Sequence, residues 1–134
     1  MSSKLTQFFH QKRFQTVNLQ LPVPQIRQSV DELLYLLFPQ RLCCEEKAPE
    51  NIQTLVTHLE ESFTQYLKLL ANLSPEVSNN ASAYVKEFME SLPEIAELLD
   101  RDVEAAFNGD PAAFSKEEVI LTYPGFFCIC IHRL

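Results

Sequence analysis

Apolar side chains recur at every third or fourth position along most of this chain, the spacing that places them on one face of an α-helix. Between Pro24 and Pro39 the pattern predicts a helix, because proline suits a helix start and disfavours helical geometry in the residue before it. A longer stripe after Pro49 predicts a second helix. Its apolar positions are Ile52, Leu55, Val56, Leu59, Phe63, Tyr66, Leu67 and Leu70.

The N-terminal segment has a short apolar face of its own, made by Leu5, Phe8 and Phe9, which predicts another helix. Residues 17–24 are expected to be extended. Residues 1–30 contain basic side chains and no acidic one, which fits either an organellar transit peptide or a basic amphipathic helix. We prefer the basic helix.

The middle of the chain is predicted to hold two helices separated by a capping motif. After a break at residues 72–80, the apolar residues of Tyr84–Leu92 favour a helix. Ser91–Glu94 then has the form of a capping box, in which serine and glutamate satisfy the first amides of a new helix and a proline is tolerated. This new helix is predicted to end at Asn108–Gly109 with a left-handed cap.

The last segment is predicted to be helical as well. Ser115–Glu118 forms a second capping box, which opens a helical turn. Within residues 126–134, Phe127, Ile129 and Ile131 alternate with Cys128, Cys130 and His132, a pattern that alone favours a strand. Because every other element is helical and a lone strand has no pairing partner, we predict a helix after Tyr123–Gly125. The chain is therefore expected to be a single all-α domain, a multi-helix bundle over residues 1–134.

Composition excludes several classes of function. The chain has only two glycines, so it contains no Gly-rich phosphate-binding loop of the Rossmann or P-loop kind. Its net charge of −7 argues against non-specific binding to nucleic acid, which needs a basic face. No apolar run approaches the roughly 20 residues of a membrane-spanning helix. No secretory signal is visible, and we expect a cytoplasmic protein.

Cysteine and histidine raise the possibility of a zinc site. Cys43–Cys44 together with Cys128, Cys130 and His132 would supply enough sulfur and nitrogen ligands for tetrahedral zinc. Adjacent and alternate cysteines are poorly spaced for such a site, however, and free cysteine is often buried as a small hydrophobe. We therefore predict neither a metal site nor a disulfide framework.

Acidic residues near the end of the predicted fifth helix are the other candidates. Residues 100–102 are interpreted as a solvated helix face. Asp110 precedes Pro111, an arrangement typical of a helix start in which the carboxylate accepts first-turn amides.

Residues 102–134 also carry several motifs in one order: Asp102-x-x-Ala-Ala, Gly109-Asp-Pro-Ala112, Glu118-Val-Ile-Leu121, Tyr123-Pro-Gly-Phe126 and His132-Arg133. This segment resembles the part of serine O-acetyltransferases that leads from their N-terminal helical domain into their catalytic domain. The resemblance implies that Asp110 faces the active site, contacts the substrate serine and helps to bind cysteine as feedback inhibitor. It makes His132–Arg133 a packing position rather than a catalytic one.

The resemblance further implies a reaction that this chain cannot complete alone. Serine O-acetyltransferases transfer an acetyl group from acetyl-CoA to the hydroxyl of L-serine, the first step of cysteine biosynthesis. Their catalytic histidine–aspartate pair lies on a left-handed β-helix of hexapeptide repeats, and this sequence contains none of those repeats. We therefore expect no catalytic residue, no bound cofactor and no activity in the isolated chain.

Two kinds of partner are implied as well. In the family, the helical domain self-associates into homo-oligomers, and a C-terminal tail that is not in this sequence binds O-acetylserine sulfhydrylase. The alternative interpretation is a stand-alone helical oligomerisation module without catalysis. An unrelated zinc-binding helical protein is a third.

Overall fold

The structure is a computed structural model that describes residues 21–41 and 51–134. The described chain forms α2 (Val23–Leu37), the 3-10 helix η1 (Pro39–Arg41), α3 (Ile52–Lys68), α4 (Pro75–Asn79), α5 (Ala81–Gly109), α6 (Lys116–Thr122) and α7 (Pro124–Arg133). These ranges contain no strand, which confirms the predicted all-α bundle. The predicted helix around Leu5–Phe9, the pair Cys43–Cys44 and residues 17–20 of the predicted extended stretch 17–24 lie outside the described residues. The end of that stretch is wrong, because Val23 and Pro24 already form the first turn of α2.

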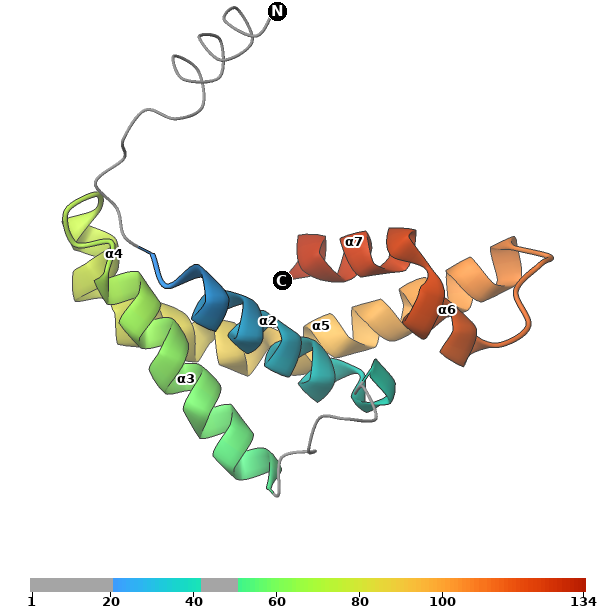
Figure 1. Ribbon diagram of the computed structural model, residues 1–134, viewed down its shortest axis with the longest axis horizontal. Helices are drawn as coiled ribbons and strands as arrows, with labels where there is room; N and C mark the ends of the chain where they lie inside the picture. Colours follow the sequence, from blue (N-terminus) through green and yellow to red (C-terminus); the bar gives the residue numbers. More distant parts are fainter. Residues whose placement is uncertain (1–20, 42–50) are drawn as a thin grey trace, which may run out of the picture.

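The long helix α5 organises the other elements (Figure 1). Helices α2 and α3 pack beside each other and α3 packs on the N-terminal part of α5, whereas α6 and α7 pack on its C-terminal part. Two apolar clusters result, one in each half. The N-terminal cluster buries Leu33, Leu55, Leu59 and Leu92. The C-terminal cluster buries Leu34, Phe38, Leu99, Val103, Val119, Ile120, Phe126 and Cys130. Neighbouring residues of α2 serve both clusters, because Leu33 is buried in one and Leu34 in the other. Helix α2 therefore joins the two halves.

The helix α5 runs without interruption through Pro93, so the predicted break at Ser91–Glu94 is wrong. Instead of capping a new helix, the Ser91 hydroxyl donates to the carbonyl of Phe88 at 2.7 Å. The physical reason is burial, because one apolar stripe continues on both sides of the proline while Pro93 itself is exposed. The buried members of this stripe are Ala81, Val85, Leu92, Leu99 and Val103.

Two other predicted boundaries need correction. The predicted break at residues 72–80 contains the short helix α4, which begins with Pro75 at its first turn. Helix α5 does end at Gly109, but neither glycine of the chain has a positive φ, so the predicted left-handed cap is wrong. The chain leaves the helix through Asp110, whose backbone is extended.

The predicted serine cap at the start of α6 is confirmed, and the glutamate of the motif accepts the amide one residue before the cap. The Ser115 hydroxyl accepts the Glu118 amide at 3.1 Å, and the Glu118 carboxylate reaches back to the Phe114 amide at 2.8 Å. Helix α7 follows at once, since Tyr123 ends α6 and precedes Pro124 at the first position of α7.

Helix α7 confirms the choice of helix over strand. It buries Phe126 and Cys130, four residues apart and therefore on one helical face, against the C-terminal cluster. No helix of the described residues is long and apolar enough to cross a membrane.

Candidate functional site

Asp110 lies at the exit from α5, where backbone and side chain are both hydrogen-bonded. Its amide donates to the carbonyl of Ala106 at 3.2 Å, and its own carbonyl accepts the Ala113 amide at 3.1 Å. The carboxylate atom Oδ1 accepts the Ala112 amide at 2.9 Å. Pro111 and Ala112 form a turn rather than a helix, so the predicted helix start at Asp110 is wrong and the carboxylate closes a tight turn.

The second carboxylate oxygen of Asp110 has a partner from another part of the chain. The Tyr123 hydroxyl donates to Oδ2 at 2.7 Å across a separation of 13 residues. Tyr123 is the link between α6 and α7, since the helix predicted to follow Gly125 already begins at Pro124. The same residue is the side-chain partner of the candidate site. No sequence signal linked the two residues, since helix α6 lies between them.

This hydrogen bond changes the titration of both groups. It is the main cause that lowers the pKa of Asp110, and the Ala112 amide lowers it further. The same bond raises the pKa of Tyr123 to about 12. At neutral pH the pair therefore consists of an ionised carboxylate and a protonated phenol.

The turn that carries Asp110 is bounded by an ion pair between helices. Lys116, at the start of α6, pairs with Glu104 on α5, and this contact is the main cause of the lowered pKa of Glu104. The chain between Glu104 and Lys116, which contains the end of α5 and the turn at Asp110, thus has its two ends held together by opposite charges.

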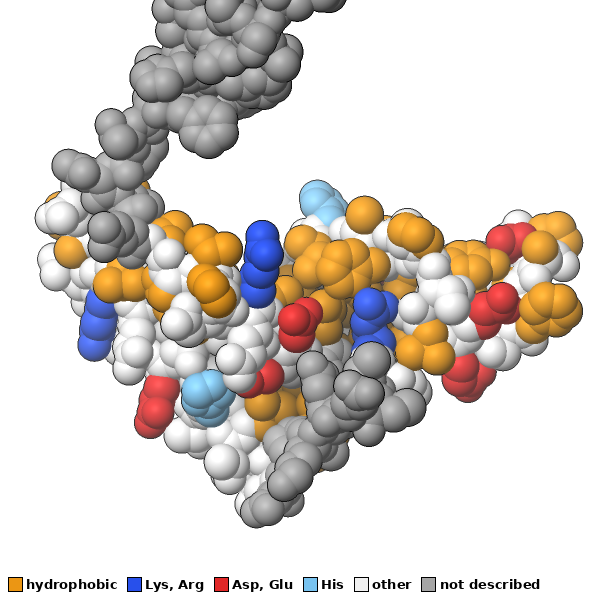
Figure 2. Space-filling model, viewed as in Figure 1, with side chains coloured by type: hydrophobic (Ala, Val, Ile, Leu, Met, Phe, Trp, Pro, Cys, Tyr) orange, Lys and Arg blue, Asp and Glu red, His pale blue; other side chains and the backbone are white. Residues whose placement is uncertain are grey.

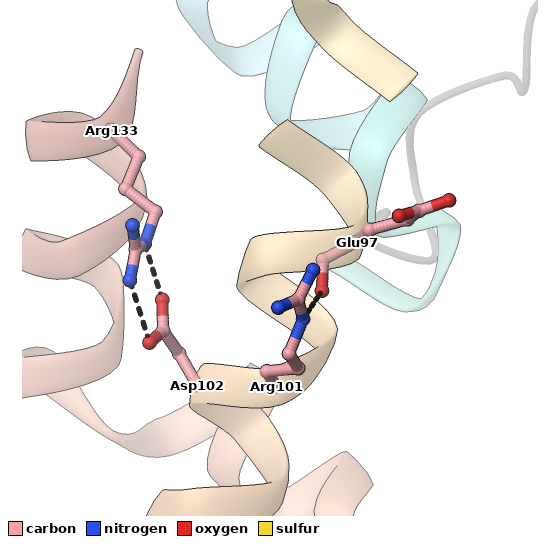
Figure 3. A network of polar contacts seen from close by, with 4 residues as sticks. All are labelled: Glu97, Arg101, Asp102 and Arg133. Atoms are coloured by element: carbon pink, nitrogen blue, oxygen red, sulfur yellow. Dashed lines mark hydrogen bonds and ion pairs between the residues drawn. The ribbon is translucent and has the colours of Figure 1, made fainter. Parts of the chain in front are cut away.

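A second tie between helices involves Asp102, whose interpretation as part of a solvated face is wrong. Arg133 donates to both carboxylate oxygens of Asp102, at 2.5 and 2.9 Å, across 31 residues (Figure 3). The exposed fractions of the two side chains are 33% for Arg133 and 21% for Asp102. Arg101 points to the other side and donates to the Glu97 carbonyl at 3.3 Å, as Figure 3 shows. The two-point contact fixes the end of α7 on α5.

The other residues considered in the sequence do not gather into a site. His132 is exposed, Cys128 is exposed, and Cys130 is buried among apolar side chains of the C-terminal cluster. Burial is the main cause that raises the pKa of the Cys130 thiol, so this thiol is poorly suited to bind a metal as a thiolate. Within residues 21–41 and 51–134, no three His, Cys, Asp or Glu side chains are placed to hold a metal ion.

Away from Asp110, the helices leave an open apolar cleft of about 570 Å³. Its lining residues carry no charge, and the two tyrosine hydroxyls are the polar side-chain groups among them. They are Ile26, Val30, Leu33, Phe63, Tyr66, Leu67, Tyr84, Val85, Phe88, Ile131 and Leu134. Such a surface suits contact with other apolar groups rather than polar chemistry.

The described residues thus form a helical unit in which two neutral donors hold the ionised Asp110 carboxylate. Comparison with known proteins finds that the chain is similar in sequence to a protein of the serine acetyltransferase class. Over 58 residues the chain is 50% identical to the plasmid serine acetyltransferase of Synechococcus elongatus. The matched residues cover 43% of this chain and 18% of that protein. No family model matches the chain. The resemblance noted from the sequence is confirmed by this similarity and agrees with the all-helical fold.

Proposed function

We propose that this chain is the N-terminal helical domain of a serine O-acetyltransferase and that Asp110 contacts the substrate serine. The observation that carries the proposal is the Asp110 carboxylate, which is ionised and held by two neutral donors at the end of α5. The similarity to a serine acetyltransferase supplies the reaction to which such a carboxylate belongs.

In the proposed reaction the serine hydroxyl oxygen attacks the thioester carbonyl of acetyl-CoA. The hydroxyl proton passes to a general base, the carbon–sulfur bond breaks, and CoA leaves as its thiol once the sulfur takes up a proton. The products are O-acetyl-L-serine and CoA. Neither the base nor the acetyl-CoA site is assigned to residues of this chain, so the chain alone is expected to be inactive.

The role of Asp110 is to bind the ammonium group of serine. A carboxylate offers about four lone-pair positions, and the Ala112 amide and the Tyr123 hydroxyl occupy two of them. The others remain for N–H donors of an ammonium group, and bonds between ionised partners are the strong ones. Cysteine carries the same ammonium group, which makes the same carboxylate a contact for this amino acid as feedback inhibitor.

The second role of the domain is to connect to a catalytic domain and to self-associate. The Asp102–Arg133 contact holds the end of α7 in one direction relative to α5, which would set the path of the chain toward a catalytic domain. Acetyl-CoA is then the co-substrate of that domain, and O-acetylserine sulfhydrylase is a partner of the complete cytoplasmic enzyme.

A second candidate function is a helical oligomerisation module without catalysis. The observation that favours it is a set of exposed apolar side chains on and beside α6 and α7, where Figure 2 shows hydrophobic groups gathered. Phe114 is 91% exposed, and Leu121, Phe127, Ile129 and Ile131 are exposed to smaller extents. An apolar surface of this kind favours self-association.

Kinetics of the protein encoded by the complete reading frame would test the first proposal. We expect CoA release that depends on serine, and Asp110→Asn should raise the KM for serine at least tenfold while the KM for acetyl-CoA changes less than twofold. Asp100→Asn, the same chemical change at an exposed position of α5, is the matched control and should have no effect. Equal losses for both substrates would show that Asp110 is structural.

The oligomeric state of residues 1–134 would test the second. Serine-independent oligomers of this chain, together with a complete reading frame that releases no CoA, would favour the assembly module over the enzyme.

A further inference from the structure

We propose that Tyr123 is a positioning residue, which fixes the orientation of the Asp110 carboxylate toward the substrate ammonium group. This inference rests on the proposed function of Asp110. It adds a residue that the sequence analysis named only as the first member of the motif Tyr123-Pro-Gly-Phe126.

Tyr123 is suited to this role because its own position is fixed. Its amide donates to the Val119 carbonyl at 3.3 Å, which ends α6, and its backbone is extended at φ −82° and ψ 109° before Pro124. Its side chain is half-buried and packs against the C-terminal cluster. A tyrosine has only two side-chain torsions, so a packed ring leaves the hydroxyl little freedom.

Asp110 needs such a partner because one hydrogen bond does not orient a carboxylate. The second side-chain torsion of aspartate has a broad, roughly two-fold profile, so the carboxylate plane can rotate when only the Ala112 amide holds it. The Tyr123 hydroxyl binds the other oxygen, at 2.7 Å, and two contacts define the plane. The directions of the unoccupied lone pairs are then fixed as well.

The charge of the partner matters as much as its position. Among the described residues, no Lys, Arg or His forms an ion pair with Asp110, and the nearby Lys116 pairs with Glu104. The Glu118 carboxylate, which also acts on Tyr123, is bonded to the Phe114 amide. Positioning by a neutral hydroxyl therefore leaves the negative charge of Asp110 available to a cationic ligand, whereas an arginine would have neutralised it.

Tyr123→Phe in the complete protein would test the proposal, because it removes the hydroxyl and keeps the ring. We expect the KM for serine to rise about fivefold to twentyfold, because the Asp110 carboxylate loses one of the two hydrogen bonds that orient it. The KM for acetyl-CoA and kcat should stay within twofold of wild type. Tyr35→Phe is the matched control, since Tyr35 packs on the other cluster of the molecule, and it should leave all three parameters unchanged.

Two further measurements separate positioning from folding. In residues 1–134, titration of the Asp110 carboxyl by NMR should give a higher pKa in Tyr123→Phe than in wild type. In the complete protein, Tyr123→Phe should add little to the serine KM of Asp110→Asn, because the two residues act through one contact.

Each outcome decides between the hypotheses. A serine KM in Tyr123→Phe equal to that in Tyr35→Phe, equal rises for both substrates, or a loss confined to kcat would overturn the positioning role while Asp110→Asn still identified the ammonium contact. An unaffected Asp110→Asn, or no CoA release by the wild-type protein, would overturn the proposed function itself and the positioning role with it.

Discussion

Pro93 provides a direct test of the continuous helix α5, because replacing it with alanine should stabilise the protein. Proline inside a helix lacks the amide that would donate to the carbonyl four residues earlier, here that of Met89, and is about 3 kcal/mol less favourable than alanine. Proline also restricts the unfolded chain, which offsets about 0.4–1 kcal/mol of this difference. Because Pro93 is exposed, its removal opens no cavity. We therefore expect Pro93→Ala to raise the free energy of unfolding by about 2 kcal/mol.

Urea denaturation followed by circular dichroism at 222 nm would measure the change in residues 1–134. The midpoint should rise with little change in slope, and the melting temperature should increase by roughly 6–10 °C. Pro75→Ala is the matched control, since Pro75 stands in the first turn of α4, where no helical hydrogen bond is lost. This control should leave stability unchanged or slightly lower.

Pro93→Ala with a stability within about 0.5 kcal/mol of wild type would refute the reasoning. That result, combined with a loss of about 1 kcal/mol in Ser91→Ala, would mean that a new helix begins at Pro93 behind a serine cap.

Three further predictions concern the core and the two polar contacts between helices. Leu99→Ala removes a fully buried side chain of α5 and should cost about 2–5 kcal/mol of unfolding free energy in urea denaturation; a loss below 1 kcal/mol would contradict its place in the core. The stability difference between wild type and Tyr123→Phe should be largest near neutral pH. This difference should shrink as pH falls through the lowered pKa of Asp110, and also as pH rises from about 10 toward the Tyr123 pKa of about 12. The reason is that the bond needs an ionised carboxylate and a protonated phenol. A stability difference independent of pH would exclude this pairing. Asp102→Asn should accelerate hydrogen exchange in α7 more than in α3, less so at high salt, because Arg133 loses its ionised partner; equal rates in α7 would show that the contact does not anchor this helix.

Local sequence signals were sufficient for much of the fold. The apolar period predicted α2 and α3 close to their observed bounds, and the Ser115–Glu118 motif predicted the start of α6. These signals work because their causes act within one or two helical turns, through the side chains that share a face and the amides at a helix start. The resemblance in the last third of the chain drew attention to Asp110 for the same reason, since its motif is a short run of adjacent residues.

The sequence by itself therefore determined an all-helical chain, most of its helix starts and the residue on which the candidate site is built. Only the tertiary structure decided that α5 continues through Pro93, because the apolar stripe on either side is buried against helices distant in sequence. It also decided that Tyr123 holds Asp110 and that Arg133 holds Asp102, pairs separated by 13 and 31 residues. A hydrogen bond between side chains on different helices, or at their ends, exists only once packing has set the separation and rotation of those helices, and no pattern along one helix encodes that geometry.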